Sequence, residues 1–257
     1  ARIVTKGKSS MKIISQPSPN FDERSADGNV NLLVMHYTGM PTAHDAMSRM
    51  CDEKAQVSAH YMVDEDGSIY RLVDESKRAW HAGIGAWRGR ASLNDTSIGI
   101  EIVNPGHEHG YRAFPDKQMQ SVMELSKEVM NRHDIEPRNV IGHSDLAPNR
   151  KEDPGELFDW PMLAKHGVGL WPQVRRVSRP HRGLVNPGDE SIAVAEIQRM
   201  LSNYGYHIRV DGHYGEKTEV VTKAFKRHFV PENVSVMWDN MADARLQELL
   251  SMVPDAL

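Results

Sequence analysis

The sequence predicts an α/β protein in which helices flank a central mixed β-sheet, followed by a small all-α domain of three helices. Two observations lead to this fold class. Short strand-like segments alternate with helical ones in the first part of the chain, as in a sheet with helices packed on it. A stretch rich in Pro and Gly then precedes three more helical segments. The 257 residues give room for two domains. We predict an α/β domain over 1–166 (core about 28–166), a linker over 167–187 and a helical domain over 188–257.

Five segments of the α/β part have the composition of β-strands. Residues 31–37 form a nearly continuous apolar run, as expected for a buried strand. Residues 59–64 and 68–73 flank an Asp-Gly pair, and this pair between two strand-like runs is a strong hairpin signal. The other two candidates are 98–103, where apolar side chains alternate, and the short segment 139–142.

Three helices are expected between and after these strands. Asp116 is placed to cap a helix that runs to about Asn131 and carries five apolar residues on one face. A shorter helix is expected over about 41–50. Asp159 is placed to cap a third helix, with Pro161 in its first turn.

The segment 165–187 has the composition of a linker. It contains six Gly and Pro residues, five Lys and Arg residues and no acidic residue. Such a basic stretch either contacts an anionic surface or is a solvated connector. The helices of the C-terminal domain are predicted after it, at 191–203, 216–229 and 243–252.

Charge and cysteine content exclude several classes of protein. The formal charge of -4 argues against a nucleic-acid binder, which normally has a basic excess. A single cysteine, Cys51, allows neither an intramolecular disulfide nor a Cys-rich metal motif.

No apolar run reaches the roughly 18–20 residues that cross a bilayer. The first eight residues do not resemble a signal peptide, so either none existed or the numbering begins after its removal.

Three residues suggest an open metal site. His36 ends the first core strand, His143 follows the short strand 139–142, and Asp153 comes ten residues later. Two imidazoles and a carboxylate suit zinc, because nitrogen and oxygen donors at about 2.0–2.2 Å leave a fourth tetrahedral position for water. Spacing alone leaves Asp145 as an alternative carboxylate ligand.

A series of motifs occurs in one order along residues 28–166. They are His36-Tyr-Thr-Gly, Ser58-Ala-His-Tyr61, Asp66-Gly-Ser-Ile-Tyr70, Trp80-His-Ala-Gly83, Ser97-Ile-Gly-Ile-Glu101, Gly142-His-Ser-Asp-Leu-Ala-Pro148, Lys151-Glu-Asp-Pro-Gly155 and Phe158-Asp-Trp160. This pattern resembles the zinc N-acetylmuramoyl-L-alanine amidase family, which includes T7 phage lysozyme and the peptidoglycan recognition proteins. Within the family it is most similar to a two-domain branch typified by an outer-membrane lipoprotein amidase.

The resemblance assigns roles that spacing cannot. It implies one Zn²⁺ per chain held by His36, His143 and Asp153, which decides against Asp145. It implies that Glu101 is the general base and that Lys151 stabilises developing negative charge. From the residues alone, Glu101 is either a solvated residue on an apolar strand or a carboxylate that faces the metal.

Three further residues are expected to line the substrate groove. They are His81, Trp80 and Trp87, because aromatic faces suit sugar rings and peptide stems, although a core role for Trp80 remains open. Four more histidines of the α/β part are interpreted as surface or loop residues: His44, His107, His109 and His133.

The C-terminal part resembles the three-helix peptidoglycan-binding domain. The residues that carry this resemblance are Ile197-Gln-Arg-Met-Leu201, Tyr204-Gly-Tyr206, Val210-Asp-Gly-His-Tyr-Gly215, Thr218 and Ala224-Phe225. Lys226 stands where that family often has Gln. Either ligand binding or a purely structural role is therefore open for this domain.

The two resemblances imply a function. The expected reaction is hydrolysis of the amide bond between N-acetylmuramic acid, or its anhydro form, and L-alanine of the stem peptide. Peptidoglycan and muropeptides are the expected partners, with no nucleic acid, and the chain is expected to be a monomer. A periplasmic location is implied, with a lipid on a residue upstream of Ala1 as its only membrane contact. Rival interpretations are a non-catalytic wall-recognition protein, a zinc peptidase that cuts within the stem, and a cytosolic recycling amidase.

Overall fold

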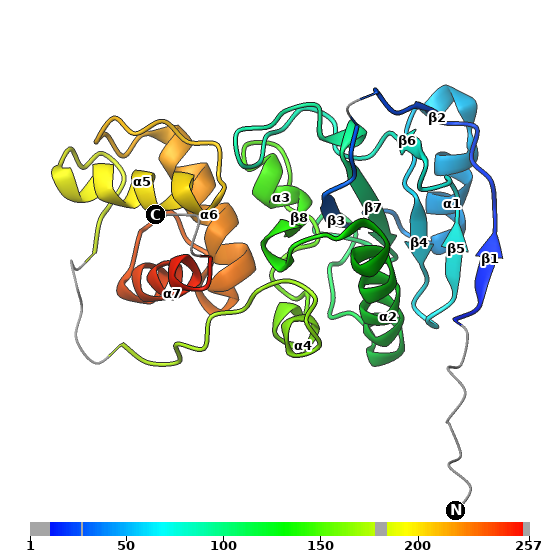
Figure 1. Ribbon diagram of the computed structural model, residues 1–257. Helices are drawn as coiled ribbons and strands as arrows, with labels where there is room; N and C mark the ends of the chain where they lie inside the picture. Colours follow the sequence, from blue (N-terminus) through cyan, green and yellow to red (C-terminus); the bar gives the residue numbers. More distant parts are fainter. Residues whose placement is uncertain (1–10, 27, 178–183, 254–257) are drawn as a thin grey trace, which may run out of the picture.

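The computed structural model describes residues 11–26, 28–177 and 184–253 (Figure 1). A mixed sheet flanked by helices forms the first part of the chain, and three helices form the last part, so the predicted fold class is confirmed. Residues 1–10 of the predicted α/β domain and residues 178–183 of the predicted linker lie outside the described residues. Within the described part, no helix is long and apolar enough to span a membrane.

The main sheet has six strands in the order β1-β5-β4-β7-β3-β8. The central strands β4, β7, β3 and β8 run parallel, whereas β5 is antiparallel to β4 through the predicted hairpin. Strands β2 and β6 form a separate antiparallel pair. The strands are β1 (Ile13–Ser15), β2 (Phe21–Glu23), β3 (Leu32–Tyr37), β4 (Tyr61–Val63), β5 (Ile69–Arg71), β6 (Lys77–Ala79), β7 (Ser97–Ile102) and β8 (Val140–Gly142).

Alternating side chains of the central strands serve two different cores. Leu33 and Met35 of β3 pack with the apolar face of α2 (Asp116–His133) and with α4 (Trp160–Lys165). Leu32 and Val34 point the other way and join a cluster formed mainly by the C-terminal helices. On that second side lie α3 (His143–Leu146) and, over β4 and β5, α1 (Ala43–Cys51).

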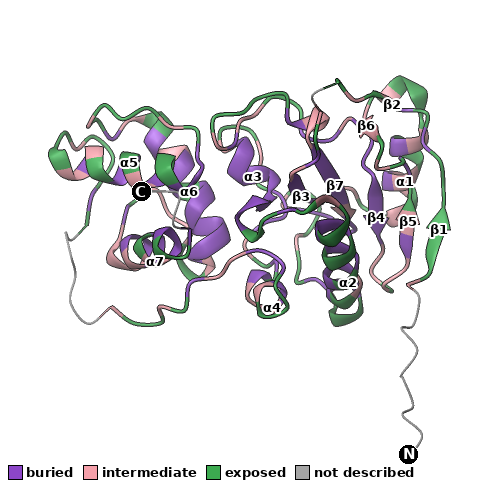
Figure 2. Cartoon of the chain, viewed as in Figure 1, coloured by how far each residue is buried: buried purple, intermediate pink, exposed green. Residues whose placement is uncertain are grey.

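The C-terminal helices pack directly against the α/β part. They are α5 (Ile192–Tyr204), α6 (Glu216–Phe229) and α7 (Asn240–Ser251). Their core is continuous with apolar residues of the first part, including the buried Trp87. Figure 2 shows buried residues on α3 and on the helix α6 that faces it.

Helix boundaries agree with the capping signals, with two corrections. Asp159 caps α4, and its carboxylate accepts the N–H of Met162 at 3.0 Å. The cap of α2 is Pro115, so the predicted cap Asp116 is instead the first helical residue. Helix α7 begins at Asn240 rather than near 243, because Asp239 accepts the N–H of Ala242 and starts the helix earlier.

Three strands were not predicted. β1, β2 and β6 lack the longer apolar runs and the Asp-Gly turn that indicated the equally short strands β4, β5 and β8. β1 and β2 are also mostly exposed, so burial does not select apolar residues along them.

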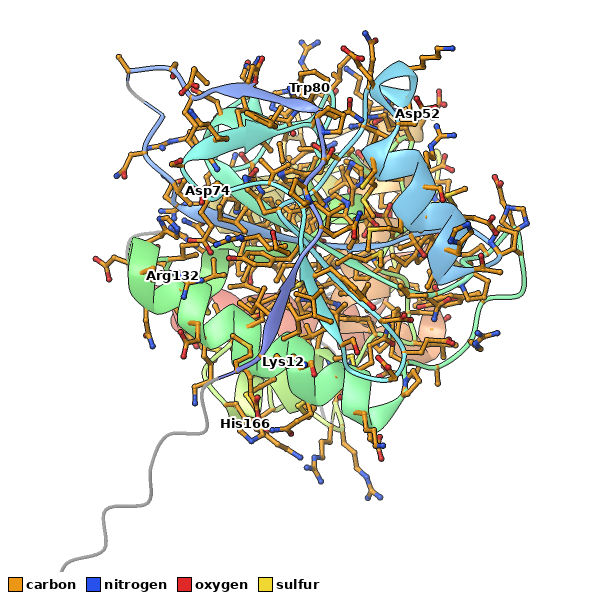
Figure 3. All side chains as sticks on the ribbon, turned by 90° about the vertical axis from the view of Figure 1, so that its right-hand side faces the viewer. Lys12, Asp52, Asp74, Trp80, Arg132 and His166 are labelled. Atoms are coloured by element: carbon orange, nitrogen blue, oxygen red, sulfur yellow. The ribbon has the colours of Figure 1, made fainter. Side chains whose placement is uncertain are left out.

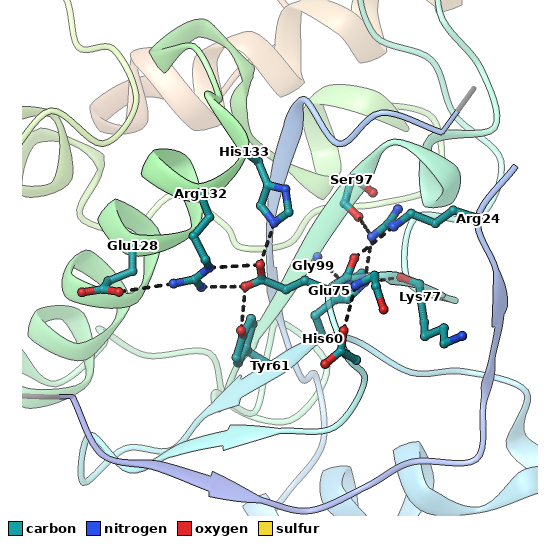
Figure 4. A network of polar contacts seen from close by, with 12 residues as sticks. Arg24, His60, Tyr61, Glu75, Lys77, Ser97, Gly99, Glu128, Arg132 and His133 are labelled. Carbon is teal, nitrogen blue, oxygen red and sulfur yellow. Dashed lines mark hydrogen bonds and ion pairs between the residues drawn. The ribbon is translucent and has the colours of Figure 1, made fainter. Parts of the chain in front are cut away.

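A half-buried acidic residue ties the end of α2 to the sheet. Glu75 accepts hydrogen bonds from Tyr61 of β4 and from Arg132 and His133 of α2, each at 2.6 Å (Figure 4). Burial opposes ionisation, but these donors together lower the pKa of Glu75 to about 2.

Candidate metal centre and active site

His36 and Glu101 are neighbours on two adjacent parallel strands. β3 and β7 pair so that His36 lies opposite Glu101, and paired residues of neighbouring strands project from the same face of the sheet. On β7 this face carries Ser97, Gly99 and Glu101, whereas the intervening isoleucines join the core under α2. The polar face is thus set by the period of two along the strand.

His143 and Asp153 reach the same place from two loops. β8 lies beside β3 and ends at Gly142, so His143 starts α3 next to the end of β3. The backbone N–H of Ser144 donates to the carbonyl of Asp153 at 2.9 Å, which holds the two loops together. All three side chains are buried, with exposed fractions of 1% for His36, 3% for His143 and 6% for Asp153.

The three side chains present one donor atom each to a common point. His36 Nδ1 lies 2.9 Å from His143 Nδ1 and 3.0 Å from Asp153 Oδ2, and His143 Nδ1 lies 3.1 Å from the same oxygen. Donors at about 2.0–2.1 Å from a tetrahedral zinc ion stand about 3.3 Å apart. These three residues therefore fit a zinc ion with small outward shifts, and they form the candidate metal group of the described residues.

A chain of hydrogen bonds fixes which nitrogen of His36 carries its proton. The carbonyl of Leu93 only accepts, so the Ser97 hydroxyl donates to it at 2.6 Å and accepts from His81 Nε2 at 3.1 Å. His81 Nδ1 is then an acceptor, and it receives the N–H of His36 Nε2 at 3.0 Å. His36 Nδ1 is left with its lone pair directed at the other two candidate ligands, as metal binding requires.

Metal binding also requires that the ligand atoms facing the common point carry no proton. Burial, with a smaller contribution from His143, lowers the pKa of His36 to about 4, so its ring is neutral. Burial works against ionisation of Asp153, whereas a proton on the facing ring of His143 or His36 lowers the pKa of its carboxyl. His143 Nε2 lies 3.0 Å from the carbonyl of Ala82, to which it donates, leaving its Nδ1 lone pair for a metal.

Glu101 stands beside this group with one uncommitted oxygen. Its Oε2 atom is buried and has no hydrogen-bond partner. Burial, and after it the charge of Asp153, raise the pKa of Glu101 well above its usual value, while Lys151 opposes the shift. Glu101, Lys151 and the three candidate ligands all line one cleft of about 360 Å³.

Asp145, the alternative carboxylate ligand, faces away from the metal group. Its oxygens accept from the Tyr206 hydroxyl at 2.6 Å, from His228 Nδ1 at 2.7 Å and from the backbone N–H of Gly142 at 2.8 Å. These contacts occupy both of its oxygens and leave it in the interface with the C-terminal helices.

The residues predicted to line the substrate groove lie in three different settings. His81 reaches the cleft, but both of its ring nitrogens are engaged in the chain from Leu93 to His36. Its ring lies on β7 where only a glycine leaves room, because a Cβ on Gly99 would come within 2.5 Å of it.

Neither tryptophan lines this cleft. Trp80 lies at the upper edge of the molecule in Figure 3 and donates its indole N–H to Asp22 of β2 at 3.2 Å. Trp87 is 3% exposed and packs edge-on against Tyr204 and Tyr206 of the C-terminal part. Their positions give no support to contact with a ligand in the cleft.

His107, interpreted from the sequence as a surface or loop histidine, lies in a loop and is half-buried, and it also lines the cleft. Its Nδ1 lies 3.0 Å from the Tyr37 hydroxyl, its Nε2 lies 3.2 Å from Glu156, and its ring stacks on Tyr111. Its sequence context, a loop with Pro, Gly and a second His, gave no signal of this environment. Ser97 was also missed, although it shares the period-two face of β7 with Glu101.

Comparisons with known proteins agree with this geometry. Residues 26–156 match the family model of N-acetylmuramoyl-L-alanine amidases, and residues 190–234 match that of a peptidoglycan-binding domain. The chain belongs to the N-acetylmuramoyl-L-alanine amidase family. The family expected from the motif series is therefore confirmed.

Relatives of this amidase match it over most of its length or over about half of it. It is 36% identical over 238 residues to the amidase AmiD of Escherichia coli, covering 88% of this chain and 83% of AmiD. It is 36% identical over 161 residues to the 1,6-anhydro-N-acetylmuramyl-L-alanine amidase AmpD of Citrobacter freundii, covering 56% of this chain and 84% of AmpD.

Solved structures show the same arrangement over nearly the whole chain. The structure of Escherichia coli AmiD, in complex with its substrate anhydro-N-acetylmuramic acid-L-Ala-D-γ-Glu-L-Lys, matches with a TM-score of 0.76 at 34% identity and covers 92% of this chain and 99% of that one. AmpDh3 of Pseudomonas aeruginosa matches with a TM-score of 0.71 at 27% identity and covers 98% of this chain and 100% of that one.

Proposed function

We propose that this amidase hydrolyses the bond between the lactyl carbonyl of N-acetylmuramic acid, or its anhydro form, and the L-alanine nitrogen of peptidoglycan stem peptides. The single observation that carries the proposal is the buried group of two imidazole nitrogens and one carboxylate oxygen within 3.1 Å of one another, beside Glu101. Substrate complexes of the relatives AmiD and AmpDh3 contain anhydromuramic peptides and support the anhydro form as a substrate.

In this proposal His36, His143 and Asp153 hold one zinc ion. A zinc ion at this position supplies Lewis acidity for amide hydrolysis at neutral pH. The hydrogen-bond chain through His81 and Ser97 keeps His36 in the tautomer that presents Nδ1. The Ala82 carbonyl accepts the Nε2–H of His143 and so keeps His143 in the tautomer that presents its Nδ1.

Glu101 and Lys151 carry out the remaining steps in this proposal. The Glu101 carboxylate accepts a proton from the attacking water at its unbonded Oε2 and delivers it to the departing L-alanine amine. Burial and the charge of Asp153 raise the pKa of this carboxyl, which favours its acceptance of the proton from water. The Lys151 ammonium, which lines the same cleft, stabilises negative charge on the carbonyl oxygen.

The proposed location follows from the substrate. An enzyme with an amidase part (1–166), a linker (167–187) and a wall-binding part (188–257) is suited to work on peptidoglycan in the periplasm. A lipid anchor upstream of Ala1 would hold it at the outer membrane, and we propose that one chain acts as a monomer. Cell fractionation and light scattering test these points separately.

Product analysis by mass spectrometry tests the reaction itself. Purified peptidoglycan is incubated with the protein, with and without a chelator, and the released peptides are identified. Intact stem peptides with a free L-alanine N-terminus, lost on chelation and restored by zinc, are expected. Fragments cut within the stem would point to a peptidase, and no cleavage by zinc-loaded protein would point to a wall-recognition protein.

A further inference from the structure

The last turn of α6 lies against both loops that carry candidate metal ligands. Helices α3 and α6 are in contact (Figure 1), and α3 begins at His143. Arg227 and His228 of α6 are buried, with exposed fractions of 6% and 3%. His228 reaches the loop of His143, and Arg227 reaches the loop of Asp153.

His228 and Tyr206 hold the start of α3 through Asp145. Asp145 is 1% exposed and accepts the Tyr206 hydroxyl on Oδ1 and the His228 Nδ1–H on Oδ2. The same Oδ2 accepts the backbone N–H of Gly142, which directly precedes His143. The carboxylate that orients the His143 backbone is therefore itself oriented by two donors from the C-terminal part.

Arg227 holds the second loop. Its guanidinium donates to Glu152 at 2.9 Å and lies 3.5 Å from Glu156. Glu152 directly precedes Asp153, and both line the cleft. The contact is charge-assisted, with a buried guanidinium and an exposed carboxylate, and it favours one orientation of the loop.

We propose that the C-terminal three-helix part is a positioning element of the metal centre, acting through Tyr206, His228 and Arg227. The inference rests on the proposed zinc amidase function. It adds that the C-terminal helices are needed for hydrolysis even of substrates that they do not bind. The physical reason is that ligand atoms must be held closely for tight metal binding, and loss of an outer hydrogen bond typically weakens metal affinity or activity about 10–100-fold. A tethered wall-binding domain has no such effect on a small soluble substrate.

A matched pair of tyrosines tests the inference. Tyr206→Phe removes the donor to Asp145 and keeps the ring, whereas Tyr214→Phe removes a buried hydroxyl of the same part that bonds Thr222 and Val236 instead. Zinc affinity is measured by competition with a chromogenic chelator, and hydrolysis is measured on a soluble anhydromuramyl tripeptide. We expect Tyr206→Phe to bind zinc about 10-fold more weakly and to lose kcat with KM nearly unchanged, while Tyr214→Phe stays near wild type.

A second pair separates the hydrogen bond of His228 from its packing. The His228 ring stacks on Trp160 and Phe229, and its Nε2 has no hydrogen-bond partner. His228→Leu and His228→Asn both lose this stacking, but Asn keeps an N–H near the position of Nδ1. We expect His228→Asn to recover most of the zinc affinity that His228→Leu loses.

The outcomes separate this inference from the proposed function. Lack of hydrolysis by wild type and by Tyr214→Phe would reject the amidase function. Hydrolysis and zinc affinity of Tyr206→Phe equal to those of Tyr214→Phe, with no difference between the two His228 variants, would reject the positioning role and leave the amidase function standing.

Discussion

Replacing Glu101 by Gln tests the chemical step most directly. The amide has the shape of the carboxylate, so the strand pairing with His36 and the ring of His81 on Gly99 are undisturbed. The three candidate ligands are unchanged, and zinc content is therefore expected to equal that of the wild type. Only the ability to take a proton at Oε2 is lost.

The expected loss of turnover is large because nothing near Glu101 replaces it. A general base contributes about 10²–10⁴-fold, or about 2.7–5.4 kcal/mol of transition-state stabilisation. Among the described residues lining the cleft, the other acidic side chains besides Asp153 are Glu108, which is exposed, and Glu152, which is bound to Arg227. We therefore expect kcat to fall about 10³-fold or more, with KM within about threefold of the wild type.

Single-turnover hydrolysis of a soluble muropeptide, followed by chromatography of the released peptide, measures the effect. Glu124→Gln is the control, because it makes the same change of charge on the exposed side of α2. Turnover by Glu101→Gln within tenfold of wild type at equal zinc content would refute the assignment of the base.

Four further changes have defined expected outcomes. Asp153→Asn removes the anionic donor and should weaken zinc binding by more than the roughly 10–100-fold of an outer-shell change, measured by chelator competition. Ser97→Ala removes the acceptor of the hydrogen-bond chain and should weaken zinc binding about 10-fold with little loss of stability, whereas an unchanged affinity would show that the chain does not set the tautomer. Glu75→Gln should lower the free energy of unfolding by about 2 kcal/mol at pH 7, allowing for partial screening. Because the pKa of Glu75 is about 2 in the folded state and higher in the unfolded state, its carboxylate stabilises the fold above about pH 4.5. In urea unfolding curves, the difference between wild type and variant should therefore vanish as the pH falls towards 2. Lys226→Ala leaves Asp239 without its buried partner and should cost about 3 kcal/mol in the same assay, and a loss below 1 kcal/mol would contradict a structural role.

Lys226, which stands where the family often has Gln, has a structural role. The sequence showed only that Lys stands where Gln is frequent. In the structure its side chain is fully buried, and Nζ donates to Ser235 and Asp239 and to the carbonyl of Met237. The substitution therefore serves the packing of α6 against the start of α7, and it takes the side chain away from any surface ligand.

The sequence by itself determined most of the elements and, through the family resemblance, the identity of the candidate ligands. Apolar runs and an Asp-Gly turn specify strands and a hairpin, because side-chain period and turn chemistry are local properties. The order of the motifs specified the family, and His36, His143 and Asp153 do converge. Local patterns failed for β1, β2 and β6, whose mostly polar or exposed residues form no extended apolar run.

Only the tertiary structure decided which way the remaining polar residues face. His81 is held between His36 and Ser97, Trp87 is covered by the C-terminal helices, and Asp145 binds Tyr206 rather than a metal. Each of these outcomes depends on partners that approach through folding rather than through neighbouring sequence. An imidazole, an indole or a carboxylate has the same local propensity whether it is a ligand, a relay or an interface contact, so its role is fixed by the groups that surround it in three dimensions.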